Sequence, residues 1–231
     1  MTKRAVFLYD VTGIAARPWI DAGYECWLFD GQHPEGITRE GNMVKVGMWF
    51  HHDQCDEHAK WIKSQVINAE IVIGFPECTD LTVAGARWWK DKREADPDFQ
   101  NKAKRLALLI EKVGNALECP WCFENPVGAL SNLYRLPDFT FNPCDYAGYL
   151  DCDSPHPVYP EVYPVQDRYN KSTCIWCGNG FVQPVKMRVE PFYKDNPGWK
   201  HCGGKSTRTK NIRSATPRGF AQAVWIFNSP H

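Results

Sequence analysis

A strongly amphipathic stretch between two short apolar runs constrains the fold of this chain most. Between residues 98 and 117, apolar side chains recur at steps of three and four, at Phe99, Ala103, Leu106, Leu109, Ile110, Val113 and Leu117. This is the period of a helix with one buried face. The flanking runs, 71–74 and 121–123, have the length and composition of buried strands. This order predicts two parallel strands joined by a crossover helix.

The same alternation extends toward the N-terminus. Strands are expected at 5–9, 24–29 and 43–50, with a short helix near Trp19, a polar loop at 32–41 and a helix carrying Trp61 and Val66. Strands alternating with helices predict an α/β fold with a mostly parallel sheet. Beyond Pro137 the chain is rich in prolines and aromatic residues. There we expect strands at 173–176 and 182–189, a surface loop at 151–164, and a final helix at 218–227 that opens after Pro217.

Composition limits the classes of partner. Lys plus Arg equals Asp plus Glu at 27 each, so any nucleic-acid surface must be a local patch. Residues 200–218 contain no acid and carry Lys200, Lys205, Arg208, Lys210, Arg213 and Arg218. This stretch is either a phosphate-binding surface or an ordinary solvated basic loop. No window approaches the roughly 20 apolar residues of a membrane span, so no membrane partner is expected.

The ten cysteines favour a reducing compartment over a disulfide framework. The chain opens Met1-Thr-Lys-Arg and leads directly into a short strand pattern, without the apolar run of a signal peptide. A cytoplasmic location with free thiols is therefore expected.

Two reactive side chains follow the apolar runs on either side of the long helix. Cys78 comes just after the run at 71–74, and Glu124 follows the run at 121–123. Ligands of open α/β sheets bind outside the carboxyl ends of the strands. If the two strands are neighbours, this places a candidate nucleophile beside a candidate proton donor. Each residue also has an ordinary interpretation, as an inert buried thiol or a solvent-facing carboxylate, and Glu77 beside Cys78 would raise the thiol pKa.

A second site is expected after the first strand. Asp10-Val-Thr-Gly13-Ile-Ala15 is a turn with small residues, and Asp30 closes the second strand. In nucleoside-binding α/β folds such a turn lets the cofactor approach the backbone, while an acid on the second strand accepts the ribose hydroxyls. An ordinary structural turn has the same appearance.

These residues carry a resemblance to the cytosine-C5 DNA methyltransferases, most of all to their short phage and prophage-borne relatives. Gly74-Phe-Pro-Glu-Cys78 resembles the Pro-Cys nucleophile loop, with residues 79–87 matching the short relatives, and 124–128 resembles the Glu-Asn-Val segment. Residues 11–15 resemble the Phe-x-Gly-x-Gly cofactor loop, and Asp30 the ribose acid. Residues 171–176 and 213–224 resemble the strand after the arginine-bearing segment and the closing loop and helix.

The resemblance implies S-adenosylmethionine as cofactor and cytosine in DNA as substrate, single- or double-stranded. The Cys78 thiolate would add to C6 while Glu124, beside Asn125, protonates N3, and C5 would take the methyl group from a base that has left the stack. Arg168 or Lys171 would stand where the family has an arginine, and the spacing does not decide between them. The implied cofactor residues are Asp10, Thr12, Gly13, Ile14, Ala15, Asp30, Asp53, Pro76, Ser214 and Ala215. The implied DNA contacts are Arg87, Lys205, Arg208, Lys210 and Arg213.

The resemblance also implies a Rossmann-like class I methyltransferase sheet with a small irregular C-terminal recognition region. We expect a catalytic cofactor-binding domain at 1–177, a recognition region at 178–212 and a returning C-terminal helix at 213–231. So small a recognition region implies little sequence preference, a single-stranded target, or a protein partner that supplies specificity. If the chain is phage-encoded, its location is the host cytoplasm. Glu77 stands where the family has proline, and Val11 and Ala15 replace the phenylalanine and second glycine of the cofactor loop.

Other functions remain open from the sequence. The same catalytic residues would serve the transfer of a different group to cytosine, and a non-catalytic DNA-binding relative would need only the basic stretch. Cys119-Pro-Trp-Cys122 and Cys174-Ile-Trp-Cys177 formally make a four-thiolate zinc site, as in a zinc-stabilised interaction module. Both pairs fall on expected strands, however, where residues three apart face opposite sides. We therefore expect no metal.

Overall fold

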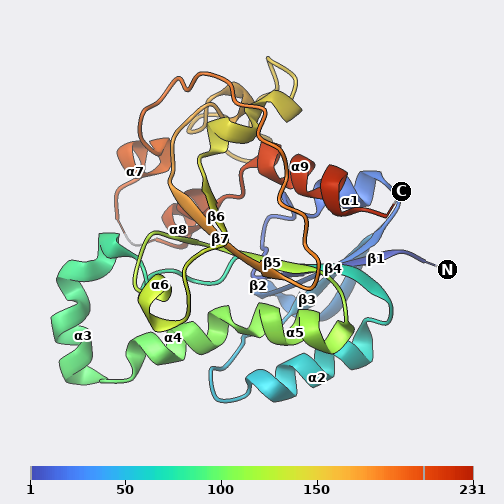
Figure 1. Ribbon diagram of the computed structural model, residues 1–231, viewed down its shortest axis with the longest axis vertical. Helices are drawn as coiled ribbons and strands as arrows, with labels where there is room; N and C mark the ends of the chain where they lie inside the picture. Colours follow the sequence, from blue (N-terminus) through green and yellow to red (C-terminus); the bar gives the residue numbers. More distant parts are fainter. Residues whose placement is uncertain (1, 205, 231) are drawn as a thin grey trace.

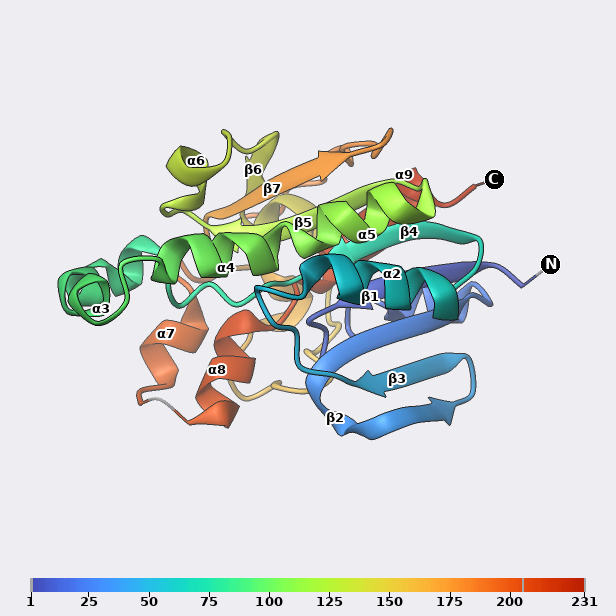
Figure 2. The same ribbon diagram turned by 90° about the horizontal axis from the view of Figure 1, so that it is seen from below.

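The computed structural model describes residues 2–204 and 206–230 and shows a sheet between two layers of helices (Figures 1 and 2). Within these residues the sheet has seven strands in the order β3-β2-β1-β4-β5-β7-β6. Strands β1 to β5 pair in parallel, except that the second half of β2 runs antiparallel to β3, and β7 and β6 are antiparallel. The expected α/β class and mostly parallel sheet are thus confirmed. The strands are β1 (Arg4–Leu8), β2 (Glu25–Glu40), β3 (Met43–Gly47), β4 (Ala69–Gly74), β5 (Trp121–Pro126), β6 (Phe139–Phe141) and β7 (Thr173–Gly178).

Helices cover both faces of the sheet because the strands bury apolar side chains on both sides. Helices α2 (Cys55–Gln65), α4 (Phe99–Ala107) and α5 (Leu109–Leu117) lie on one face, and α1 (Arg17–Asp21) and α9 (Arg218–Asn228) on the other (Figure 1). Ile62, Ile110 and Val113 belong to the buried cluster of the first face, and Trp19 and Phe220 to that of the second. This two-sided burial holds the strand ends, and the loops that follow them, in place.

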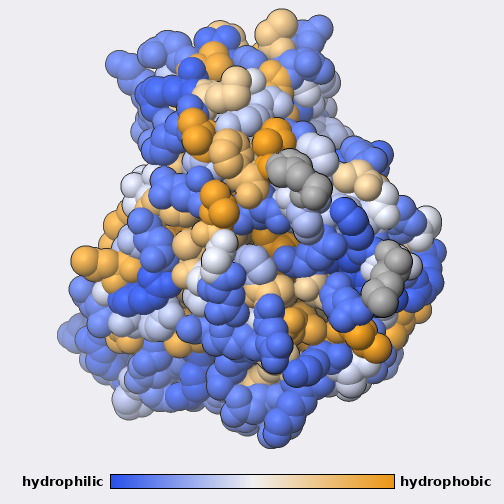
Figure 3. All heavy atoms as spheres, turned by 45° about the vertical axis from the view of Figure 1, so that its right-hand side comes forward, coloured by the Kyte–Doolittle hydropathy of each residue, from blue (hydrophilic) through white to orange (hydrophobic). Residues whose placement is uncertain are grey.

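The remaining helices are short. They are η1 (Val83–Trp88), α3 (Trp89–Ala95), α6 (Leu130–Leu133), η2 (Pro143–Tyr149), η3 (Val165–Asp167), α7 (Pro197–His201) and α8 (Thr207–Ser214). Helix α3 projects from the body at the left of both ribbon views (Figures 1 and 2). The surface turned forward in Figure 3 is mostly hydrophilic, with apolar residues in small groups. None of the described helices has the length and apolar character needed to cross a membrane.

The long helix expected at 98–117 is in fact two helices. It is interrupted at Leu108, where ψ is −4° and not the roughly −42° of a regular helix. The Tyr9 hydroxyl donates to the Leu106 carbonyl across 2.9 Å, and this is the carbonyl that an unbroken helix would offer to the amide of Ile110. A long-range contact that the local pattern cannot contain therefore accompanies the break.

The prediction of a loop at 32–41 was wrong. Strand β2 continues to Glu40, and its second half runs back along β3, so that Ile37 lies opposite Val46 and Glu40 opposite Met43. The polar composition of this segment reflects an exposed sheet edge. The strand expected at 43–50 ends earlier, at Gly47.

The second half of the chain departs from expectation in two places. Residues 182–189 form no strand and follow an irregular path along η2, where Gly148 donates to the carbonyl of Met187 across 2.8 Å. Residues 151–164 are irregular as expected, but they are not simply a surface loop. Tyr159 and Tyr163 are buried with Ile212 and Ala215 in a third apolar cluster, which fastens this loop to α8. The final helix is confirmed.

Candidate active site

The strand order reverses direction between β1 and β4. Strands β2 and β3 extend the sheet on one side of this point, and β5 on the other. In open α/β sheets, ligands bind in the crevice outside the carboxyl ends of the strands at such a reversal. The loops that leave β1 and β4 there carry Asp10 and Cys78. The fold therefore brings the two expected sites to the same edge of the sheet, on neighbouring strands.

The structure makes Cys78 and Glu124 neighbours. Strand β4 pairs in parallel with β5, with Gly74 opposite Phe123, so both residues lie at the same end of the sheet. Burial, and next the Glu124 carboxylate, raise the pKa of the half-buried Cys78 thiol to about 11. A carboxylate raises a thiol pKa in this way when it lies near the thiol. The predicted nucleophile and the predicted acid form one site.

Hydrogen bonds fix the loop that carries the thiol. The backbone amides of Leu81 and Thr82 donate to the Cys78 carbonyl across 3.0 and 2.9 Å. The fully buried Asn125 donates from Nδ2 to the carbonyl of Pro76 across 3.4 Å. The loop after β4 is thus tied directly to the segment that follows Glu124.

Glu124 is poised as a proton donor. Burial raises the pKa of its carboxyl, and Lys171 partly opposes this shift. Its Oε2 atom is buried and, among the described residues, has no hydrogen-bond partner. A buried carboxyl oxygen without a partner is costly unless it is protonated or meets a ligand. The site therefore offers a polar group to an incoming molecule.

The structure resolves the choice between the two basic candidates by position. Lys171 lowers the pKa of both Cys78 and Glu124, and its Nζ donates to the Arg213 carbonyl across 3.2 Å. Arg168 points elsewhere: its Nε donates to the Glu190 carbonyl across 2.8 Å, and its guanidinium lies 3.8 Å from the ring centre of Phe192. Lys171 is the cation at the thiol and the carboxyl.

The turn after β1 is organised by the carboxylate of Asp10. Its Oδ1 accepts hydrogen bonds from the Gly13 amide (2.8 Å), the Thr12 amide (3.1 Å) and the Thr12 hydroxyl (3.2 Å). Its Oδ2 is buried and without a partner among the described residues. Burial raises the pKa of Asp10 to about 6. Ile14 and Ala15 of the same turn are buried, Ala15 in the apolar cluster of the second face.

The acid at the end of β2 lies beside this turn. Asp30 accepts from the Gln32 amide across 2.7 Å and contributes to the raised pKa of Asp10. A residue that the sequence reasoning missed completes this region. Trp49 is 68 % exposed, yet its ring lies so close over Gly31 that a Cβ there would fall 2.1 Å from a ring carbon. The glycine directly after Asp30 was the only local indication of such an approach. Asp53 is exposed in the turn before α2.

Helix α8 and its C-terminal end contact both halves of the site. Asn211 and Gln32 exchange side-chain hydrogen bonds of 3.0 and 3.3 Å, and Lys210 Nζ lies 3.9 Å from the Glu77 carboxylate. At its end, Ser214 donates to the Asn211 carbonyl across 3.3 Å, and Ala215 is buried. The expected closing segment, which begins at Arg213, contacts the site through the Arg213 carbonyl, which accepts from Lys171. Neither Ser214 nor Ala215 directs a free polar side chain toward the site.

The expected DNA-binding residues have different surroundings. Arg87 is exposed, with its guanidinium 5.0 Å from the ring centre of Trp88. Arg208 is exposed and pairs with Glu161 at 2.8 Å. Arg213 instead donates to the Cys202 carbonyl across 2.6 Å, which is a structural role. Lys205 lies outside the described residues.

The two Cys-x-x-Cys pairs are arranged by the sheet. Cys122 lies opposite Cys177 across β5 and β7, whereas Cys174 lies opposite Asn125. Among the described residues, no group of three or more His, Cys, Asp or Glu side chains is placed to hold a metal ion.

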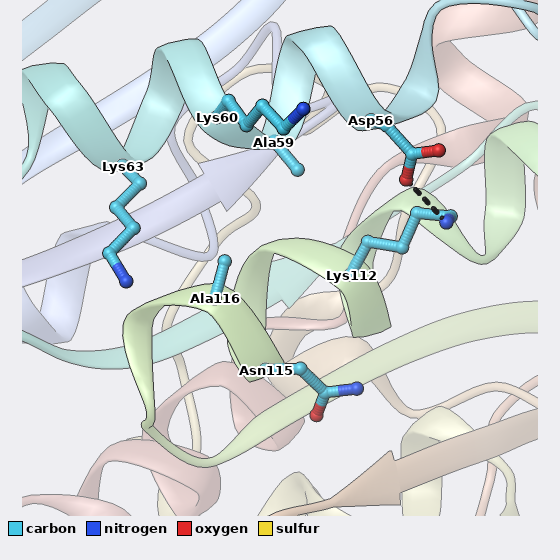
Figure 4. Close-up of a pocket in the computed structure, with 7 residues that line it drawn as sticks. All are labelled: Asp56, Ala59, Lys60, Lys63, Lys112, Asn115 and Ala116. Carbon is cyan, nitrogen blue, oxygen red and sulfur yellow. Dashed lines mark hydrogen bonds and ion pairs between the residues drawn. The ribbon is translucent and has the colours of Figure 1, made fainter.

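A shallow pocket of about 480 Å³ lies elsewhere, between α2 and α5 (Figure 4). It is lined by Asp56, Ala59, Lys60, Lys63, Lys112, Asn115 and Ala116. Asp56 and Lys112 form an ion pair at 2.6 Å across it. None of the expected site residues lines this pocket. The candidate active site is therefore identified by its residues and their contacts, and not by a cavity.

A scan against protein-family models and a search of curated proteins both found no match for this chain.

Proposed function

We propose that this protein transfers a methyl group from S-adenosylmethionine to C5 of cytosine in DNA, through a covalent bond between Cys78 and C6. The observation that carries the proposal is the placement of Cys78 and Glu124 at the same end of the neighbouring strands β4 and β5, with Lys171 as a cation that lowers the pKa of both groups. A thiol, a buried carboxyl and a cation are the groups that this reaction needs. The resemblance of both loops to the cytosine-C5 methyltransferases supports the same chemistry.

Each of the three groups has a distinct role in the proposed reaction. The Cys78 thiolate forms a bond to C6, and Glu124 donates its proton to N3, so that C5 becomes nucleophilic. C5 then takes the methyl group, and S-adenosylhomocysteine is the product that leaves. A base removes the C5 proton, the bond from sulfur to C6 breaks to release the thiolate, and the N3 proton returns to Glu124. Lys171 stabilises the negative charge on sulfur, which is consistent with its lowering of the thiol pKa.

The protonation state of Glu124 governs the second of the two main causes of the high thiol pKa, the first being burial. An ionised Glu124 raises the Cys78 pKa, and burial favours the neutral carboxyl. When Glu124 holds its proton, that repulsion disappears while the attraction to Lys171 remains. The group that donates to the base is thus also the one whose neutral form favours the thiolate.

The residues beside the pair fit the proposed cofactor. S-adenosylmethionine supplies an electrophilic methyl group when bound, and carries an ammonium, a ribose and an adenine. Asp10 offers a buried, unpartnered carboxylate oxygen suited to an ammonium, and Asp30 offers a carboxylate for ribose hydroxyls. The exposed ring of Trp49 over Gly31 offers a flat surface for adenine.

The test is to incubate the protein with cytosine-containing DNA and S-adenosylmethionine, digest the DNA to nucleosides and measure their masses by mass spectrometry. We expect a methyl-sized gain on cytosine that disappears in Cys78→Ala and Glu124→Ala. A heavier adduct would instead support the transfer of a different group. DNA binding that depends on salt but is indifferent to Cys78, with no modified base, would identify a non-catalytic DNA-binding protein.

A further inference from the structure

Exposed aromatic rings lie on both sides of the candidate active site. On the Lys171 side, Phe192 is 57 % exposed, and its amide donates to the Arg168 carbonyl across 2.7 Å. On the Cys78 side, η1 begins five residues after the thiol and ends at Trp88, which is 47 % exposed. A group of exposed rings is informative only where the rings gather on one surface together with groups that suit the same ligand.

A third ring lies on α7. Trp199 is 54 % exposed, and α7 packs beside α8 through the hydrogen bond from Arg213 to the Cys202 carbonyl. Helix α8 in turn reaches the nucleophile loop through Lys210 and Glu77. Both ribbon views place α3, α7 and α8 on the same side of the molecule (Figures 1 and 2). Through these contacts the segments that carry the three rings connect to the residues around Cys78 and Lys171, and we call this surface the entrance.

Cations accompany the rings. The Arg168 guanidinium lies over Phe192 and that of Arg87 over Trp88, at 3.8 and 5.0 Å from the ring centres. Two exposed lysines add positive charge: Lys194 lies two residues after Phe192, and Lys210 lies in α8. Rings interspersed with cations match a strand that alternates bases with phosphates.

We infer that the substrate strand binds this entrance in single-stranded form, with bases next to the target stacked on Phe192 and Trp199. This inference rests on the proposed function and names the form of its substrate. In a duplex the faces of the bases are covered by their neighbours, so exposed rings gain stacking energy only from unpaired bases. Such stacking contributes about 1–3 kcal/mol per base and tolerates any sequence, which suits the small region available for recognition.

The experiment measures binding apart from catalysis. Cys78→Ala protein without cofactor is titrated into a fluorescein-labelled 20-nucleotide strand of mixed sequence, and into the same strand as a duplex, with anisotropy as the readout. We expect the single strand to bind at least tenfold more tightly. Phe192→Ala and Trp199→Ala, each made in the Cys78→Ala protein, should weaken single-strand binding by roughly 5- to 150-fold, the fold-change that corresponds to loss of one stacked base. Duplex binding should stay unchanged.

Matched variants separate stacking from bulk effects. Phe192→Leu and Trp199→Leu keep an apolar side chain but remove the ring, and should weaken binding as the alanine variants do. Ile67→Ala changes a side chain that is 62 % exposed just before β4, at the other end of the sheet, and should have no effect. Circular dichroism of each variant checks that the fold is kept.

Two results would overturn the inference: duplex binding as tight as single-strand binding, or single-strand binding that survives loss of both rings. If the wild-type protein methylates duplex DNA but binds single strands no more tightly than duplexes, this inference is wrong and the proposed function is retained. The converse, ring-dependent strand binding without any modified cytosine, would retain the single-strand surface while removing the proposed activity.

Discussion

Asn125, the residue next to the candidate acid, donates from Nδ2 to the carbonyl oxygen of Pro76, two residues before the candidate nucleophile. The side chain is fully buried, so water does not compete for this bond. One amide thereby couples the loop that follows β4 to the C-terminal part of β5. The relative position of thiol and carboxyl, on which the proposed chemistry depends, is held from one side by this contact.

Replacing Asn125 by Ala should impair both stability and catalysis. The change leaves a buried carbonyl without its partner, which costs about 1–3 kcal/mol of unfolding free energy, and frees the nucleophile loop. Urea unfolding and methyl transfer to DNA measure the two effects. Asn228→Ala is the matched control, since Asn228 Nδ2 also donates to a backbone carbonyl, that of Val182 at 3.0 Å. It should lose stability without losing methyl transfer. Full activity in Asn125→Ala would contradict the coupling.

Replacing Glu124 by Gln should lower the pKa of the Cys78 thiol below its value of about 11. The amide keeps the shape of the carboxyl but removes the negative charge that disfavours the thiolate. The measurement is the pH dependence of Cys78 alkylation by iodoacetamide, followed on the peptide by mass spectrometry. Methyl transfer should nevertheless fall, since glutamine cannot protonate N3. The control is Glu118→Gln. Glu118 is exposed and lies just before β5, at the opposite end of this strand from the site, so its replacement should leave the pKa of Cys78 unchanged. An unchanged Cys78 pKa in Glu124→Gln would show that the Glu124 carboxylate does not act on the thiol.

Asp10→Asn should stabilise the protein at neutral pH. Burial raises the Asp10 pKa from its ordinary value of 3.8 to about 6, so the folded state binds the proton more tightly than the unfolded state. Stability contributed by the protonated acid is present below pH 4 and is lost as pH rises through 6. Asparagine keeps the acceptor for Thr12 and Gly13 without a charge. We expect a gain of up to about 3 kcal/mol at pH 8 that vanishes by pH 4.

Chemical unfolding of both proteins across this pH range measures the gain. Cofactor binding should change in the opposite direction, because the variant loses the oxygen suited to an ammonium. A stability difference that is the same at pH 4 and pH 8 would show that Asp10 is not protonated preferentially in the folded state.

Trp49→Ala should weaken cofactor binding while leaving stability nearly unchanged, because the ring is mostly exposed. An aromatic pair contributes about 0.5–1.5 kcal/mol, so the loss should be roughly two- to twelvefold, measured by calorimetry with S-adenosylhomocysteine. Gly31→Ala should cause a similar loss, since its Cβ would displace the Trp49 ring. The double variant should be no weaker than either single one. Additive losses would show that the two residues act separately.

The local sequence was sufficient where burial is regular. The apolar runs at β1, β4 and β5 and the periodic pattern of α5 predicted these elements, because each must hide one or both faces from water. Cys78 and Glu124 could be named for the same reason, since they follow such runs, although β5 continues past the expected run and includes Glu124. The pattern failed at Leu108 and in the second half of β2. In both places a contact with a distant residue, or exposure at a sheet edge, takes precedence over the local preference.

Sequence alone therefore determined the α/β class, the parallel strands and the two segments that carry the candidate chemistry. Only the tertiary structure decided that Lys171, and not Arg168, accompanies the thiol, that Trp49 covers Gly31, and that Arg213 bonds to the Cys202 carbonyl. A periodic pattern of burial depends on residues that are close together in the sequence, so it can be recognised before the fold is known. The direction of a long side chain on an irregular segment depends on partners from elsewhere in the chain, and these meet it only after the sheet has formed.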